Sequence, residues 1–185
     1  MTVLAELASE VGVNERTLRR AVRDGVIRAD RRSQRSLDIS LLEREFVRQT
    51  WRTIAALRES LRTESNVRLA LLYGSVASGT HSPRSDCDLI VELHDPSLER
   101  LADLGAKLSV AIDRPVDLTR LSDARRDPAF LSSVIEEARP LIDRDGIWLK
   151  LRRQQPMLRR RGAAEQERGR AAALRGIDHL LSRLT

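Results

Sequence analysis

The chain has 185 residues, of which 41% are hydrophobic, 32% charged and 3% aromatic, and its formal net charge is +6. This length allows one medium domain or two small ones, and no apolar run approaches the roughly 18 residues that a membrane span needs. A single cysteine excludes an intrachain disulfide framework. Because the N-terminus also lacks a signal-peptide pattern, we expect a cytoplasmic protein without membrane attachment.

Charge is distributed unevenly along the chain. Residues 1–50 carry 10 basic and 8 acidic side chains, residues 51–146 carry 13 and 16, and residues 147–185 carry 10 and 3. The basic ends favour nucleic acid or an acidic partner. The acidic middle is the place where a cation site is expected.

Residues 1–40 show the pattern of a helix-turn-helix module. Apolar residues from Val3 to Val11 recur at helical spacing, Gly12 breaks this helix, and Asn14 offers an N-cap for a second one. The apolar positions of the second helix face inward, so its arginines project outward, where a recognition helix contacts DNA. A two-stranded wing is expected to follow. The candidate DNA-contacting residues are Arg16, Arg19, Arg20, Arg23, Arg31 and Arg32.

This segment resembles the N-terminal helix-turn-helix of small bacterial regulators, especially the winged MerR-like and excisionase-like types. The alternative is a helical docking module whose arginines only solvate one face.

Residues 41–62 are predicted to form one linker helix. Ser40 and Glu43 have the spacing of a capping box, and apolar residues follow at helical intervals. Trp51 is expected to pack in the core against the next domain.

Residues 63–146 carry the residues suited to catalysis. The apolar run Val67–Tyr73 and the segment Asp86–Leu93 are predicted strands, separated by a loop rich in Gly and Ser. Alternation along the second strand puts Asp86 and Asp88 on one face and buries Cys87 on the other. Two neighbouring carboxylates repel each other unless a cation lies between them.

A third carboxylate and a phosphate-binding turn complete the predicted site. In the segment Pro115–Leu121, Asp117 faces away from Val116 and Leu118. Gly74 allows close approach of a ligand to the backbone, and Ser75 can donate to phosphate oxygens. These residues predict metal-assisted nucleotidyl transfer, in which two Mg²⁺ ions bind the attacking and leaving oxygens. Asp86 and Asp88 would bridge the ions, and Asp117 would bind the catalytic one.

The segment GSVASGTHSPRSDCDLIV resembles the signature of the DNA polymerase β-like nucleotidyltransferase superfamily, and most closely that of its minimal nucleotidyltransferases. The resemblance implies that Gly74, Ser75 and the three aspartates bind Mg²⁺ and ATP or another nucleoside triphosphate. It also implies a HEPN-type toxin as partner, since some members transfer AMP to a tyrosine of such a toxin. Arg84, in the same loop, is a further candidate for phosphate contact.

Residues 147–185 are predicted to be a basic helical extension, interrupted near Pro156 and Gly162. It could pack on its own domain or in a homodimer. Alternatively, Arg152, Arg153 and Arg159–Arg161 could contact nucleic acid or an acidic partner.

The expected fold is therefore α+β: a small mixed sheet covered by helices, preceded by a winged helix-turn-helix and followed by helix. The first functional hypothesis is a Mg²⁺-dependent transferase of AMP to a protein hydroxyl, acting as an antitoxin that binds its own operator. The second is a DNA-binding regulator whose nucleotidyltransferase fold only binds nucleotide or a partner. The third is a small-molecule, antibiotic-modifying nucleotidyltransferase, for which this length leaves little room.

Overall fold

The computed structural model describes residues 2–31, 37–82 and 85–181. Its longer helices are α1 (Val3–Glu10), α2 (Glu15–Arg23), α3 (Leu41–Thr63), α5 (Leu98–Ile112), α7 (Pro128–Glu137) and α8 (Ile147–Leu181). Two short helices are α4 (Gly74–Ser78) and α6 (Leu121–Ala124). The strands are β1 (Asp30–Arg31), β2 (Leu37–Asp38), β3 (Val67–Tyr73), β4 (Cys87–Leu93), β5 (Val116–Arg120) and β6 (Arg139–Asp143).

The N-terminal segment folds into two short helices, α1 and α2, joined by a tight turn. We refer to this pair as the helix-turn-helix, and its role in DNA binding stays a prediction. Asn14 caps α2 by accepting from the Thr17 backbone N–H at 2.9 Å, and Gly12 takes the positive φ of +71° that the turn before α2 requires. Leu4, Leu7 and Leu18 are buried between α1, α2 and the rest of the chain. Strands β1 and β2 then pair antiparallel, as expected at the base of a wing.

The central sheet has the order β5-β4-β3-β6 and is mixed. β3 pairs antiparallel with β4 and β6, whereas β4 pairs parallel with β5. Alternation along the strands gives two apolar faces. One face packs against α3 and α5, and the other against α6, α7 and the start of α8. The predicted α+β fold with a small mixed sheet is confirmed, and Cys87 is buried on the α3 side as predicted.

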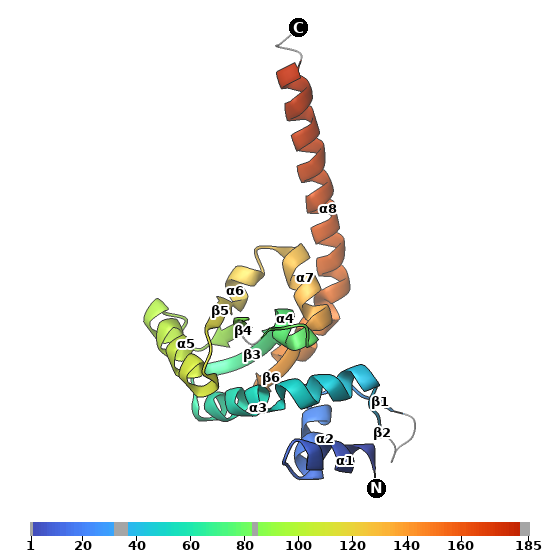
Figure 1. Cartoon of the computed structure of the whole chain (residues 1–185). Coiled ribbons are helices and arrows are strands. Elements are labelled where there is room, and N and C mark those ends of the chain that lie inside the picture. The colour runs from blue at the N-terminus through green and yellow to red at the C-terminus, as the bar shows by residue number, and fades with distance from the viewer. Residues whose placement is uncertain (1, 32–36, 83–84, 182–185) are drawn as a thin grey trace.

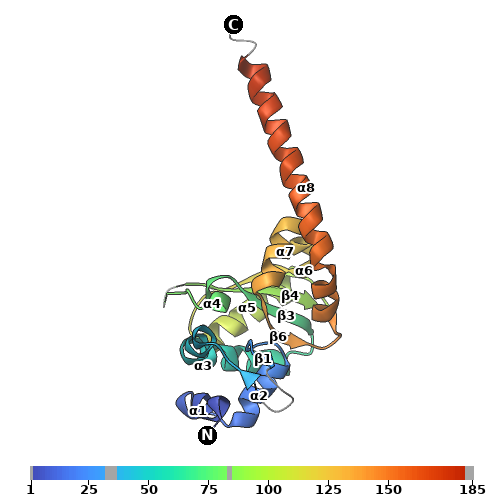
Figure 2. The same cartoon turned by 90° about the vertical axis from the view of Figure 1, so that its right-hand side faces the viewer.

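Helix α3 packs against both the helix-turn-helix and the sheet. One continuous cluster of buried side chains runs from Leu7 in α1 through Ile54 in α3 to Leu72 in β3. Figures 1 and 2 show α3 lying between the helix-turn-helix and the sheet. The segment that we expected to link two modules therefore contributes to the core of both.

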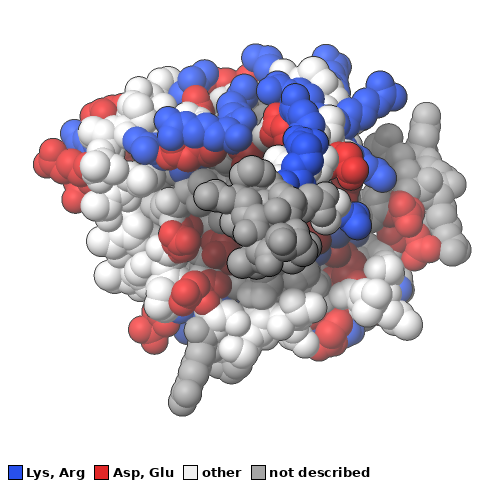
Figure 3. Space-filling model, turned by 90° about the horizontal axis from the view of Figure 1, so that it is seen from above, with Lys and Arg blue, Asp and Glu red and all other residues white. Residues whose placement is uncertain are grey.

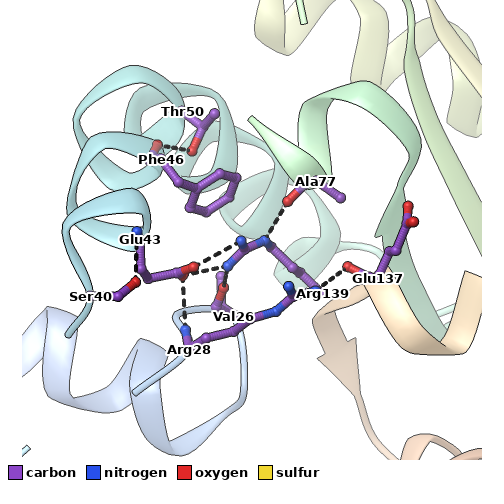
Figure 4. Close-up of polar contacts among 9 residues, drawn as sticks. All are labelled: Val26, Arg28, Ser40, Glu43, Phe46, Thr50, Ala77, Glu137 and Arg139. Atoms are coloured by element: carbon purple, nitrogen blue, oxygen red, sulfur yellow. Dashed lines mark hydrogen bonds and ion pairs between the residues drawn. The ribbon is translucent and has the colours of Figure 1, made fainter. Parts of the chain in front are cut away.

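A buried ion pair joins the same parts of the chain (Figure 4). Arg139, at the start of β6, is 2% exposed and bonds to Glu43 of α3, with Nη2 and Oε2 3.0 Å apart. Its other N–H groups donate to the carbonyls of Val26, at 2.9 Å, and Ala77, at 2.7 Å. Glu43 also accepts from the Arg28 backbone N–H. The ion pair thus connects the helix-turn-helix, α3, α4 and β6.

The predicted interruptions near Pro156 and Gly162 are wrong, because α8 is continuous from Ile147 to Leu181. The Pro156 ring is exposed, and α8 is held on both sides of it by the buried residues Leu151 and Leu158. Gly162 lies against α7, where a Cβ would come within 2.6 Å of the Ala129 Cα. This glycine serves close packing of two helices and does not end the helix.

The second half of α8 projects from the body (Figures 1 and 2). From residue 163 to 175 its side chains are exposed, apart from the half-buried Ala171, and Leu174 is 54% exposed. Figure 3 looks down on the end of this helix and shows Lys and Arg side chains gathered beside it. Among the described residues, no helix is long and apolar enough to cross a membrane.

Candidate nucleotidyl-transfer site

The three predicted aspartates lie at one end of the sheet, on adjacent strands. Asp88 of β4 is the register partner of Asp117 in β5, and of Tyr73 in β3 on its other side. Asp86 immediately precedes β4. Asp86 and Asp117 are exposed and Asp88 is half-buried between them. The structure therefore brings together the carboxylates that the sequence analysis selected.

Electrostatic repulsion acts within this group. The pKa of Asp88 is raised, first by burial and then by the negative charges of Asp117 and Asp86. The contribution of the two negative charges to the pKa of Asp88 shows that Asp117 and Asp86 are near it. Divalent cations that bind carboxylate oxygens relieve this kind of repulsion.

Gly74 and Asp88 are in direct contact. Gly74 adopts a φ of +70°, and a Cβ added to it would lie 2.5 Å from the Asp88 Oδ2 atom. Any larger residue would therefore occupy the space around the carboxylate as well as strain the backbone. Gly74 thus keeps the approach to Asp88 open.

Ser75 lies in the first turn of α4, which starts where β3 ends. The N-cap residue Tyr73 makes no side-chain capping bond to the first turn of α4. Val76 and Ala77 are fully buried and fix the helix to the core, and Gly79 ends it in a left-handed conformation. The predicted Gly-Ser turn is therefore held rigidly beside Asp88.

Tyr73 is a residue of this site that the sequence analysis missed. Its hydroxyl lies 3.4 Å from the Thr119 Oγ1 atom, and its ring packs edge-on against Phe130. Burial, followed by the charges of Asp88 and Asp117, raises the pKa of Tyr73. Strand alternation could have found it, because Leu69, Leu71 and Tyr73 share the face on which Asp88 lies.

These residues fit a hard divalent cation by their chemistry, since all three predicted ligands are carboxylates and the glycine leaves room beside one of them. Among the described residues, however, no three acidic, His or Cys side chains are close enough together to hold a metal on their own. The three carboxylates form an open group at one end of the sheet, on the neighbouring strands β4 and β5.

Several candidate residues lie outside this group. Arg84 and Arg32 lie outside the described residues, as does the side chain of Arg31, so their predicted contacts stay predictions. The four arginines of α2 are exposed, as expected. Helical spacing puts them on the face opposite the buried Leu18 and Ala21. Arg16 and Arg20 also line a groove toward α3 and β6, whereas Arg19 bonds to Glu15 and Arg23 to Asp24.

A protein-family model supports this reading of the site. Residues 55–147, half of the chain, match the model described as polymerase beta, nucleotidyltransferase. The chain therefore belongs to this nucleotidyltransferase family, and the matched segment contains the Gly74-Ser75 turn and all three aspartates.

Solved structures similar to this chain include a toxin-antitoxin complex with AMP-PNP, at 22% identity and a TM-score of 0.47, covering 69% of this chain and 98% of that one. Another is a complex of tri-AMPylated Shewanella oneidensis HEPN toxin with MNT antitoxin, at 19% identity and a TM-score of 0.43, covering 70% and 96%. A search of curated proteins finds no match.

Proposed function

We propose that this nucleotidyltransferase is Mg²⁺-dependent and transfers AMP from ATP to a hydroxyl group of a partner protein. The observation that carries the proposal is the placement of Asp86, Asp88 and Asp117 on one edge of the sheet, beside the turn at Gly74 and Ser75. Two bound Mg²⁺ ions would supply charge neutralisation and activation of the attacking hydroxyl.

The chain's own residues have separable roles in this proposal. Asp86 and Asp88 hold the metal ions, and Asp117 holds the catalytic ion and assists deprotonation of the acceptor hydroxyl. Gly74 and Ser75 bind the phosphates through backbone and hydroxyl donors. Tyr73 and Thr119 border the carboxylates and limit the space beside them.

The partner class comes from the resemblance of the Gly-Ser and Asp-x-Asp motif to minimal nucleotidyltransferases, which implies a HEPN-type toxin. We propose that the chain is the antitoxin of such a pair. The first half of α8 carries exposed basic residues on which an acidic partner can dock, namely Lys150, Arg152, Arg153 and Arg159–Arg161.

Label transfer tests the enzymatic proposal. The protein is incubated with Mg²⁺, the product of the neighbouring gene and ATP labelled at either the α- or the γ-phosphate. We expect covalent labelling of the partner from α-labelled ATP only, and its loss in Asp86→Asn. If wild type transfers no label from any nucleotide while binding the partner normally, the chain is a binding module instead.

We also propose that the helix-turn-helix binds the operator of its own gene as a dimer. The exposed arginines of α2, which are Arg16, Arg19, Arg20 and Arg23, support this proposal. A gel shift with the upstream DNA should show a band that weakens with salt, because phosphate contacts release counterions. Arg19→Ala combined with Arg23→Ala should weaken this band, and an unchanged band would exclude α2 as the recognition helix.

A further inference from the structure

A groove with a volume of about 800 Å³ lies where the helix-turn-helix meets the nucleotidyltransferase domain. Its walls come from α2, α3, β6 and the first turn of α8, and none of the three aspartates lines it. Pockets that bind small molecules commonly have volumes of about 300 to 1,000 Å³. The groove is therefore large enough for a ligand and separate from the transfer site.

The charge in this groove is unbalanced. Its acidic residues are all engaged: Asp24 pairs with Arg58 at 2.6 Å, Glu59 pairs with Arg62 at 2.8 Å, and Asp143 accepts from backbone N–H groups at the start of α8. Arg16 and Arg20 also line the groove, and neither pairs with a carboxylate among the described residues. With Arg58 and Arg62, the groove is lined by four arginines and three carboxylates, so its net charge is positive.

Two buried donors in the same walls have no acceptor. Trp51 is 5% exposed and its indole Nε1 makes no hydrogen bond, and neither does the buried Nη1 of Arg58. A buried donor without an acceptor lowers the stability of the folded protein. An anionic ligand with several acceptor oxygens would accept from the exposed Arg16 and Arg20, and it would reach the two buried donors only if side chains of the wall shift.

The remaining wall is apolar and aromatic. Trp51 and Trp148 lie on it with Pro140 and Leu141. Planar rings stack favourably on tryptophan, and arginines bind phosphate. The combination fits a ligand that has both a planar ring and a phosphate.

From these observations we propose that the groove is a second ligand site, which binds a nucleoside monophosphate without metal. A ligand there contacts both α2 and the sheet, so it would connect the helix-turn-helix with the nucleotidyltransferase domain. It would also occupy Arg16 and Arg20, which are then unavailable to DNA.

Tryptophan fluorescence is a direct probe, because the chain has two tryptophans and both line the groove. The full-length protein is titrated with AMP in EDTA, which keeps divalent metal from the aspartates. We expect saturable quenching with a dissociation constant below about 1 mM. Adenosine, which lacks the phosphate, and inorganic phosphate, which lacks the ring, should each bind at least about tenfold more weakly.

Matched variants locate the site. Arg16→Ala with Arg20→Ala should weaken AMP binding at least about tenfold. Arg152→Ala with Arg153→Ala removes the same charge from exposed positions of α8 that do not line the groove, and should leave AMP binding unchanged. Asp86→Asn should also leave it unchanged. Thermal unfolding checks that each variant folds, and if the first pair does not, Arg20→Gln alone replaces it.

Absence of quenching by AMP would overturn the proposal. So would equal weakening in both arginine pairs, loss of binding in Asp86→Asn, or binding of inorganic phosphate as tight as that of AMP.

Discussion

Asp88 is the residue at which function and stability conflict most clearly. Its raised pKa means that the folded protein favours the protonated form more than the unfolded chain does. The metal-free protein therefore loses stability as pH rises from the unfolded pKa of about 4 through the higher folded value.

Asp88→Asn should remove this pH-dependent loss. Because asparagine carries no charge, we expect the metal-free variant to have a higher Tm than wild type at pH 7, with the difference shrinking toward pH 4. Nucleotidyl transfer should be abolished. The measurement is Tm against pH in EDTA, and a variant less stable than wild type at pH 7 would show that repulsion at Asp88 is unimportant.

Gly74→Ala should disable the site through a single methyl group. The positive φ costs about 1 to 3 kcal/mol, and the Cβ also displaces the Asp88 carboxylate, which lies 2.5 Å from its position. We expect loss of transfer at saturating Mg²⁺ and ATP.

Gly146→Ala is the control for Gly74→Ala. Gly146 has a φ of +65°, and no described atom lies within 4 Å of an added Cβ. Gly146→Ala therefore introduces the same backbone strain without a clash, and this variant should keep transfer activity. Equal activity in the two variants would contradict a role for close approach at Gly74.

The buried ion pair Glu43–Arg139 holds several elements together, because its hydrogen bonds join α3, α4, β6 and the segment after α2. Replacing Arg139 with methionine leaves Glu43 buried without its cation, which typically costs about 3 to 5 kcal/mol. Urea unfolding measures this loss. Arg100→Met, at an exposed ion pair with Asp95, should be close to neutral.

A double variant separates the charge from the packing. Adding Glu43→Gln to Arg139→Met removes the uncompensated charge, so we expect it to recover part of the lost stability. If the double variant is as unstable as the sum of the single ones, the pair contributes through its separate hydrogen bonds rather than through its charges.

Helix α8 should have two parts with different contributions. Residues before Gly162 pack on α7, whereas residues 163–175 are exposed or half-buried. Deleting residues 163–185 should therefore change the free energy of unfolding by no more than about 0.5 kcal/mol. Helix content measured by circular dichroism should fall, and a large loss of stability would show that the projecting part packs on the body.

The sequence predicted those elements that have a local signal. The caps at Asn14 and Ser40 predicted helix starts, and the alternation around Asp88 predicted which side chains share a face. The continuity of α8 could not be predicted, because it depends on packing of Leu151 and Leu158 against α7. The bond between Glu43 and Arg139 spans 96 residues and has no local pattern.

At the scale of the whole molecule, the separate charge regions of the sequence become separate surfaces. The acidic segment contains the sheet, with Asp86, Asp88 and Asp117 at one end of it, and basic residues lie on α2 and along α8. The modules share one core through α3. The two modules are therefore joined by packed side chains rather than by a flexible linker.

The central claim is that the three aspartates and the Gly74-Ser75 turn form one metal–nucleotide site. Anomalous scattering from Mn²⁺, in crystals grown with Mn²⁺ and a non-hydrolysable ATP analogue, tests it most directly. We predict manganese bound to Asp86, Asp88 and Asp117, with the phosphates at Gly74 and Ser75. Nucleotide phosphates bound elsewhere, or manganese that contacts none of these carboxylates, would contradict it.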